Sequence, residues 1–518
     1  MKRNNILNIA AALWMGIVAA VGLTACSSED NFDNNQQPAQ SEVHTYSVCI
    51  PATFGDAQTR AVVTGTDPIS GKPNLVGQFK TTEKIMVYNV ELHDYAKSMS
   101  AWTYLSPDAD NATTANLVGT LAFENAIAEG QTLRLIYNHT NTTAQKLQYY
   151  VWASEPAEIQ YQPGTLAGLS NYDFAIADVT ISAGGISGTG PYTLTTSAAN
   201  FENMQSMFKF TFTGLPTGVG VQKLVVSSAN KRIVTQYDPI SGTEYTTVPA
   251  VEILLDDAAR TANSPGVVYA AIRFLSGADD ITFTVTGTDG NDYIATKSTT
   301  GFSNGKYYTA TLAMAGPFKK AAAATDSDKG KLICTAGHIH AYDADAVCTA
   351  ARVAKIIYVG NDNCEAEPYN HGLALAMSDA NSGSTCIWET SDTDAGHTTQ
   401  GSPFTIESGL QYNATHNTDD YPAFKYAIAN NGTAAPVGCS AWFLASGYQW
   451  GKMLTAAGSY TALRDGFYGV GGTNMQSNNY WSSSECDASQ AWAYVFEYGN
   501  AGVGFKSKNY YVRSALAF

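Results

Sequence analysis

His338 and His340 are separated by one residue, so on a β-strand both imidazoles lie on one face, where a metal ion could bind them. Because no third ligand stands at motif spacing, we interpret the pair as part of an exposed strand and predict neither a metal nor a cofactor. The serines at 482–484 lack the Gly-x-Ser-x-Gly pattern of a hydrolase nucleophile. The acidic pair Asp419 and Asp420 is typical of a solvated turn. We therefore predict that the protein is not an enzyme.

Three tryptophans in the last part of the chain, Trp442, Trp481 and Trp492, offer a different chemistry. Sugars stack on indole faces, so an exposed tryptophan beside amide and carboxylate groups can bind a glycan. We take Trp481, Trp492, Asn479 and Glu485 as candidate ligand-binding residues. The alternative is that these tryptophans are core residues of a loop-rich fold.

The cysteines are concentrated in the last part of the chain. An even set outside the cytoplasm suggests up to three disulfides, with the pairing open. No C-x-x-C pair occurs, which argues against a zinc knuckle or a thioredoxin-like site. We expect Cys49, further towards the N-terminus, to be a small buried residue. The candidate disulfide cysteines are Cys334, Cys348, Cys364, Cys386, Cys439 and Cys486.

The first residues have the pattern of a signal peptide. Lys2 and Arg3 precede an apolar run at 6–21, which is shorter than the ~20 residues of a spanning helix. The run leads to Leu-Thr-Ala-Cys, which resembles the bacterial lipobox and implies a signal peptide over 1–25 and lipidation at Cys26. The polar, acidic segment 26–42 is expected to be a flexible tether, and it resembles the surface-export signal of Bacteroidota lipoproteins. We therefore expect a protein anchored at the cell outer membrane and exposed on the surface.

Composition and charge exclude one further class of function. The chain has 518 residues with 45 acidic and 29 basic side chains, a formal net charge of −16, and no basic stripe. This balance excludes a nucleic-acid-binding protein. The 45 Gly and 30 Tyr, with only 14% charged residues, favour strands and turns over long helices.

Over most of the chain, the sequence predicts short strands. Phe208–Phe212 and Ile281–Thr286 alternate with period two, and such segments recur from 43 to 314, which predicts antiparallel β-sandwiches. Ser446 with Gln449 forms a capping-box pattern that predicts a helix start. Gly- and Ser-rich or Ala-rich stretches suggest the boundaries. The expected parts are a first sandwich at 43–187, a second at 188–315, a linker at 316–329 and a loop-rich α+β domain at 330–518.

The first two parts resemble the fimbrillin, or Mfa-like, family of Bacteroidota. The matching residues, besides the lipobox, are Thr59-Arg60-Ala61, Phe79 with 84–88, Asn203-Met204 before 208–210, and 305–308. The resemblance implies two tandem transthyretin-like sandwiches. It also implies cleavage between Arg60 and Ala61 by an Arg-specific protease, which removes the lipidated segment and a first strand. The implied partners are other fimbrillin subunits, joined by strand exchange.

The last part resembles a C-type-lectin-like domain of the Fibrobacter major paralogous or Legionella collagen-like C-terminal type. The matching segments are 442–446 before Trp450, 480–485, 491–493 and 511–518, although Ala445 and Gln449 stand where Pro and Glu are usual. Together the two resemblances imply a cell-surface pilus subunit, a tip adhesin that accepts a donor strand and binds a host or bacterial glycan or protein. The alternatives are a structural surface lipoprotein or pilus anchor without a ligand, and a glycan-processing enzyme.

Overall fold

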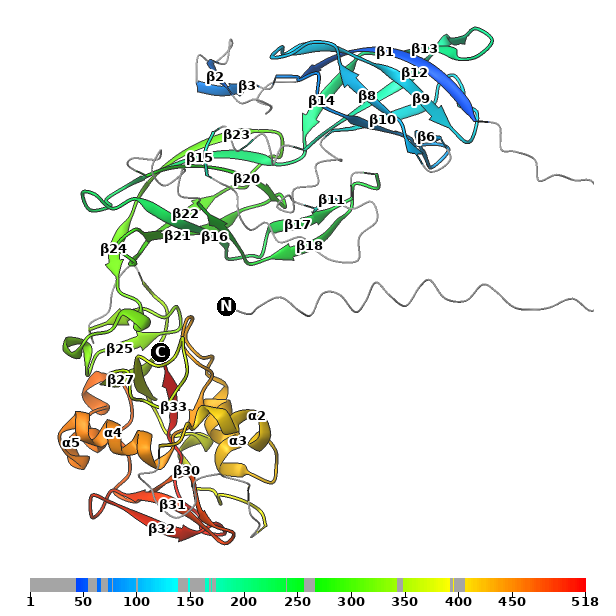
Figure 1. Ribbon diagram of the computed structural model, residues 1–518. Coiled ribbons are helices and arrows are strands. Elements are labelled where there is room, and N and C mark those ends of the chain that lie inside the picture. The colour runs from blue at the N-terminus through cyan, green and yellow to red at the C-terminus, as the bar shows by residue number, and fades with distance from the viewer. Residues whose placement is uncertain are drawn as a thin grey trace, which may run out of the picture. The chain divides into compact units, whose positions relative to one another are not determined.

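The computed structural model shows a mainly β protein (Figure 1). Among the residues that it describes, no helix is long and apolar enough to cross a membrane. The predicted signal peptide and tether, with Cys26, Arg60 and Ala61, lie outside those residues. The described residues are 43–54, 63–66, 73–76, 78–98, 101–137, 148–149, 164–166, 169, 174–238, 240–255, 266–341, 348–391, 395 and 406–518.

A nine-stranded sheet forms the first part. Its strands follow the order β10-β12-β13-β1-β9-β8-β4-β5, and β10 also pairs with β4, which closes the pairings into a ring. The buried side chains of these strands make one apolar core. The strands are β1 (His44–Phe54), β4 (Ile85–Asn89), β5 (Asp94–Tyr95), β8 (Tyr104–Pro107), β9 (Thr114–Phe123), β10 (Thr132–Tyr137), β12 (Ala175–Ser187), β13 (Tyr192–Thr196) and β14 (Ala199–Asn203).

The predicted boundary at 187/188 is wrong. β13 and β14 lie beyond it, yet both pair with β1, parallel to it, so the first part continues to Asn203. The Gly- and Ser-rich stretch at 183–190 lies where β12 turns into β13 and is not a linker. These parallel pairs also depart from the purely antiparallel sandwich that the strand pattern predicted. Parallel neighbours are joined by long connections, which local sequence patterns do not show.

Two sheets packed face to face form the second part, and a parallel pair, Ser206–Thr213 with Tyr307–Ala313, again departs from the predicted antiparallel sandwich. Phe208, Phe210 and Phe212 all point into their shared core. One sheet contains β11 (Gln148–Tyr149), β17 (Ile233–Tyr237), β18 (Glu244–Val248), β20 (Val267–Phe274), β15 (Ser206–Thr213) and β23 (Tyr307–Ala313). The other contains β19 (Ala250–Leu254), β16 (Val221–Ser228), β21 (Asp279–Gly287), β22 (Asp292–Thr299) and β24 (Ala315–Phe318).

The segment predicted as a linker, 316–329, is packed rather than free. β24 pairs with β22, and two short 3-10 helices follow at Ala321–Ala323 and Asp326–Asp328. Ala321 and Ala324 are buried, since an alanine-rich stretch can fill a close contact as readily as it can form a flexible tether. Asp328 is buried as well and accepts hydrogen bonds from two lysine ammonium groups, those of Lys319 and Lys331.

The last part combines a six-stranded sheet with helices and a three-stranded sheet. β33, coloured red in Figure 1, lies between β28 and β29, so this strand is internal to its sheet. The helix predicted at Ser446 begins there, with both hydrogen bonds of the capping box. The strands are β25 (Leu332–Cys334), β26 (Ile339–His340), β27 (Arg352–Val359), β28 (Gly372–Ala376), β29 (Phe443–Leu444), β33 (Ser514–Ala517), β30 (Asn479–Asp487), β31 (Gln490–Val495) and β32 (Asn500–Phe505).

The remaining elements are short. The helices are α2 (Asn413–His416), α3 (Pro422–Ala429), α4 (Gly447–Ala457) and α5 (Tyr460–Asp465), with 3-10 turns at Asn381–Gly383, Leu410–Tyr412, Asn430–Gly432 and Tyr468–Val470. Two small hairpins complete the set, β2 (Val63–Thr66) with β3 (Pro73–Val76), and β6 (Lys97–Ser98) with β7 (Ala101–Trp102).

Candidate functional site

Strand β1 lies inside the first sheet, not at its edge (Figure 1). On one side it forms ten antiparallel pairs with β9, from His44↔Phe123 to Thr53↔Thr114. On the other side it pairs with β13 and then with β14. A chain that lost β1 would therefore expose backbone donors and acceptors on both neighbouring strands.

The side chains of β1 alternate strictly between core and solvent. Tyr46, Val48, Ile50 and Ala52 are each at most 4% exposed, and all belong to the core of the first part. The residues between them face outward, so Cys49 is exposed and the prediction that it is buried is wrong. Loss of this strand would leave an apolar groove with four successive side-chain positions.

Pro51 interrupts the ladder at one point. Proline has no backbone N–H to donate, and it is rare inside a central strand. It stands opposite Asn116 of β9, at the place where the neighbour on the other side changes from β13 to β14. The proline therefore occupies the stretch of β1 that is paired on one side only.

Two of the four candidate ligand-binding residues are buried, which contradicts their predicted role. Trp481 has no exposed surface, and its indole N–H donates to the carbonyl of Cys386 at 2.9 Å. Glu485 is likewise fully buried and pairs with the ammonium group of Lys506. A glycan cannot reach either side chain, so the alternative of core residues holds for Trp481, and also for Trp442, which is 3% exposed.

The other two candidates, Trp492 and Asn479, are half-buried. Trp492 on β31 stands directly opposite Val503 on β32, which is 47% exposed. Phe505, two residues further on the same face, is 53% exposed. We call Trp492, Val503 and Phe505 the hairpin patch. Sequence reasoning missed Val503 and Phe505, although the spacing of two apolar residues on alternate positions of a strand was visible.

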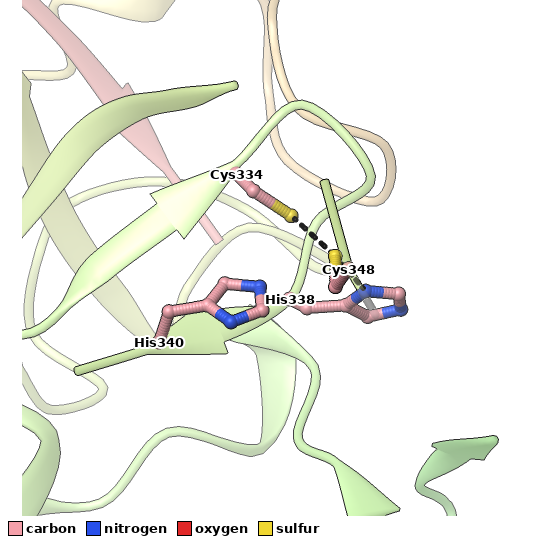
Figure 2. A group of neighbouring side chains, drawn as sticks. All are labelled: Cys334, His338, His340 and Cys348. Carbon is pink, nitrogen blue, oxygen red and sulfur yellow. Dashed lines mark hydrogen bonds between the residues drawn. The ribbon is translucent and has the colours of Figure 1, made fainter. Parts of the chain in front are cut away.

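The histidine pair does not lie on an exposed strand, as the sequence had suggested. His338 and His340 are 2% and 5% exposed, and two cysteines, Cys334 and Cys348, lie against them. One ligand atom from each of the four residues falls within 4.8 Å of all the others. Figure 2 shows the four side chains gathered at one point. We call this set the Cys–His cluster.

A hairpin turn brings the cluster together. β25 ends at Cys334, the chain turns at Gly337, and β26 pairs back with β25. Gly337 has φ +84°, and a Cβ there would lie 2.1 Å from the carbonyl oxygen of Val437, so only glycine fits the turn. Cys348 then returns to the hairpin, with its sulfur 3.8 Å from that of Cys334. None of the six candidate cysteines is disulfide-bonded in the structure.

Hydrogen bonds set the charge of the cluster. Burial alone would raise the pKa of the Cys334 thiol, but hydrogen bonds from His338 and His340 lower that pKa below its ordinary value. Burial alone would lower the pKa of His338, but hydrogen bonds to Asp292, Cys334 and Cys348 raise it. The environment thus favours a thiolate at Cys334, the form in which cysteine binds metals.

Comparison with known proteins gives only distant similarity. No protein-family model and no curated protein matches the sequence. Among solved structures, the tip fimbrial protein Mfa3 of Porphyromonas gingivalis, with a C-terminal truncation, matches at 10% identity and a TM-score of 0.29, over 53% of this chain and 96% of that one. A fimbrial assembly protein of Parabacteroides distasonis matches at 11% identity and a TM-score of 0.25, over 52% of this chain and 91% of that one. A candidate cell adhesion protein of Bacteroides uniformis matches at 15% identity and a TM-score of 0.29, over 52% and 93%. Similarity of this size does not assign the chain to a family.

Proposed function

We propose that this protein is a cell-surface fimbrial subunit in which β1 is exchanged for a strand of a neighbouring subunit, and that it works at the tip of the fimbrium. The observation that carries the proposal is the position of β1. It is a central strand that precedes the predicted cleavage site at Arg60, and it fills one row of the core with alternate side chains. The motifs that resemble fimbrillins support the same reading.

Strand exchange is energetically reasonable for this groove. Burial of one Val or Ile side chain contributes about 1.5–3 kcal/mol. Val48 and Ile50 are fully packed, and Tyr46 and Ala52 extend the same row. A donor strand with apolar residues at alternate positions would recover these contacts and the two hydrogen-bonded ladders, as in β-augmentation.

The placement of β33 supports the tip position. A stalk subunit needs both a groove and a free donor strand. Here β33 is held between β28 and β29, and its residues are all buried, so β33 is not available as a donor strand. Such a subunit accepts a neighbour but does not extend the filament. Ligand binding then falls to the accessible surface of the last part, for which the hairpin patch is our candidate for contact with a glycan or protein.

The exchange can be tested by cleavage after Arg60. A labelled N-terminal fragment should remain bound after cleavage and should be released by excess peptide of sequence 43–54. The matched control is the same peptide with Ile50→Asp, which places a charge at a buried position and should release nothing. If the wild-type peptide neither binds nor displaces the fragment from cleaved protein, strand exchange at β1 is wrong.

The tip position needs a test in cells. Immunogold labelling should place the protein at filament ends, and Arg60→Ala should keep it off the filaments. Label spread evenly along the shaft would contradict the tip position. A protein that keeps its lipid and its Arg60 bond uncut in wild-type cells would instead be an anchor. A glycan and matrix-protein array should use the whole chain, because 316–329 is packed and not a free linker.

A further inference from the structure

We infer that the Cys–His cluster is a structural zinc site, in which Cys334, His338, His340 and Cys348 are the four ligands of one Zn²⁺. Two thiolates and two imidazoles are the donor set that Zn²⁺ takes in structural sites. All four residues are buried, and they are within reach of one point. With four protein ligands no coordination position is left for a substrate, so the site stabilises structure and does not catalyse a reaction.

Two of the distances between ligand atoms agree with a tetrahedral ion. Zn–S bonds of about 2.3 Å at the tetrahedral angle place two sulfurs about 3.8 Å apart. The sulfurs of Cys334 and Cys348 are 3.8 Å apart. A Zn–N bond of about 2.0–2.1 Å likewise places sulfur and nitrogen about 3.5–3.6 Å apart. Cys348 Sγ and His338 Nδ1 are 3.6 Å apart.

A disulfide is the competing arrangement of the same two cysteines. It would require the sulfurs to be about 2.05 Å apart, well short of the distance observed. It would also leave two buried histidines beside a neutral bond, with nothing to explain why both rings turn toward the sulfurs. The geometry therefore favours the ion, and the disulfide is an outcome that the experiment below can detect.

The second ring nitrogen of His338 is held as in a metal site. Nδ1 faces Cys348, and Nε2 lies 3.0 Å from a carboxylate oxygen of Asp292 on β22. Ligating histidines commonly donate their other N–H to a carboxylate, which fixes the tautomer and the ring orientation. This contact leaves Nδ1 free to coordinate the ion.

Asp292 is itself fixed from the other side. The hydroxyl of Thr286 donates to it at 2.6 Å, and the ammonium group of Lys320 lies 2.9 Å away. The His338 ring also stacks on Phe318, with centroids 5.5 Å apart. A cavity of about 550 Å³ lies beside the cluster, and His338 and Cys348 are among its lining residues. The site thus has a carboxylate that orients His338 and a cavity beside two of the ligands, features that a metal site requires.

The test is metal analysis of the mature chain, purified in air without chelators. We expect one zinc per chain by elemental analysis. After exchange with Co²⁺, we expect the visible absorption of a tetrahedral cobalt–thiolate centre. Cys334→Ser and His340→Gln should each lose the metal. Cys486→Ser, which alters a half-buried cysteine outside the cluster, should keep it.

Two results would overturn the inference. One is a chain without zinc whose peptide map shows Cys334 joined to Cys348. The other is zinc that remains bound in both Cys334→Ser and His340→Gln. If these variants do not fold, the unaltered chain decides the question. A chain that contains no zinc and shows no cobalt–thiolate absorption after exchange has no such site.

Discussion

Lys506 is the group whose loss should most disturb the last part of the chain. Its ammonium group is fully buried and contacts two carboxylates, Glu389 at 2.8 Å and Glu485 at a shorter distance. It also lies 4.8 Å from the ring centroid of Trp388. Glu485 accepts a further hydrogen bond from the backbone of Ala395. In Lys506→Met, a side chain of similar length removes the positive charge that both buried carboxylates contact.

The magnitude follows from that burial. Removal of one partner from a buried ion pair destabilises proteins by about 3–5 kcal/mol, because the remaining charge is neither solvated nor paired. For a cooperative unit the size of the last part of the chain, 1 kcal/mol shifts Tm by about 2–4 °C. A loss of about 3–5 kcal/mol should therefore lower Tm by roughly 6–20 °C. Five of the eight tryptophans lie between Trp388 and Trp492, so denaturant unfolding followed by tryptophan fluorescence reports on this part.

Two matched variants make the test specific. Lys508→Met removes an exposed lysine two residues away and should leave Tm unchanged. Combining Lys506→Met with Glu389→Gln and Glu485→Gln removes the buried negative charge and should restore part of the stability. If Lys506→Met unfolds within about 0.5 kcal/mol of the wild type, the ion pairs do not stabilise the fold.

Three further changes test other parts of the structure. Ile50→Ala removes a fully buried side chain of β1 and should lower the free energy of unfolding by about 2–5 kcal/mol, whereas Cys49→Ala, exposed on the same strand, should change little in the same denaturant titration. Burial alone would raise the pKa of Asp328, but hydrogen bonds from its two lysine partners hold that pKa below its ordinary value. The ionised Asp328 carboxylate therefore stabilises the fold above pH ~4, and this contribution is lost as the pH falls. The Tm difference between wild type and Asp328→Asn should therefore be largest near neutral pH and shrink below pH ~4; a constant difference would contradict the assignment. Ser446→Ala removes the helix cap of α4 and should decrease stability by about 1–2 kcal/mol in thermal unfolding, and an unchanged Tm would mean that the cap contributes nothing.

The sequence predicted those features that depend on neighbouring residues. Alternation over Phe208–Phe212 gave strand β15, and Ser446 with Gln449 gave the start of α4, because a strand face and a capping box are each specified within a few positions. The first boundary was missed because β13 and β14 join β1 across about 140 residues of intervening chain, and no local pattern reports that pairing. The packing of 316–329 was missed because an alanine-rich segment has the same composition whether it is packed or free.

The Cys–His cluster was missed for a related reason. Its ligands stand at positions 334, 338, 340 and 348, a spacing that matches no common zinc motif. The sequence pattern therefore did not link the two cysteines to the two histidines. The turn at Gly337 brings these residues together in space, because it places Cys334 beside the returning strand that carries His340. The outer-shell carboxylate, Asp292, belongs to β22, earlier in the chain than any of the ligands. An ion bound here would therefore hold the first hairpin of the last part in shape and, through His338, support its contact with β22, which is a structural role that a linear ligand motif cannot reveal.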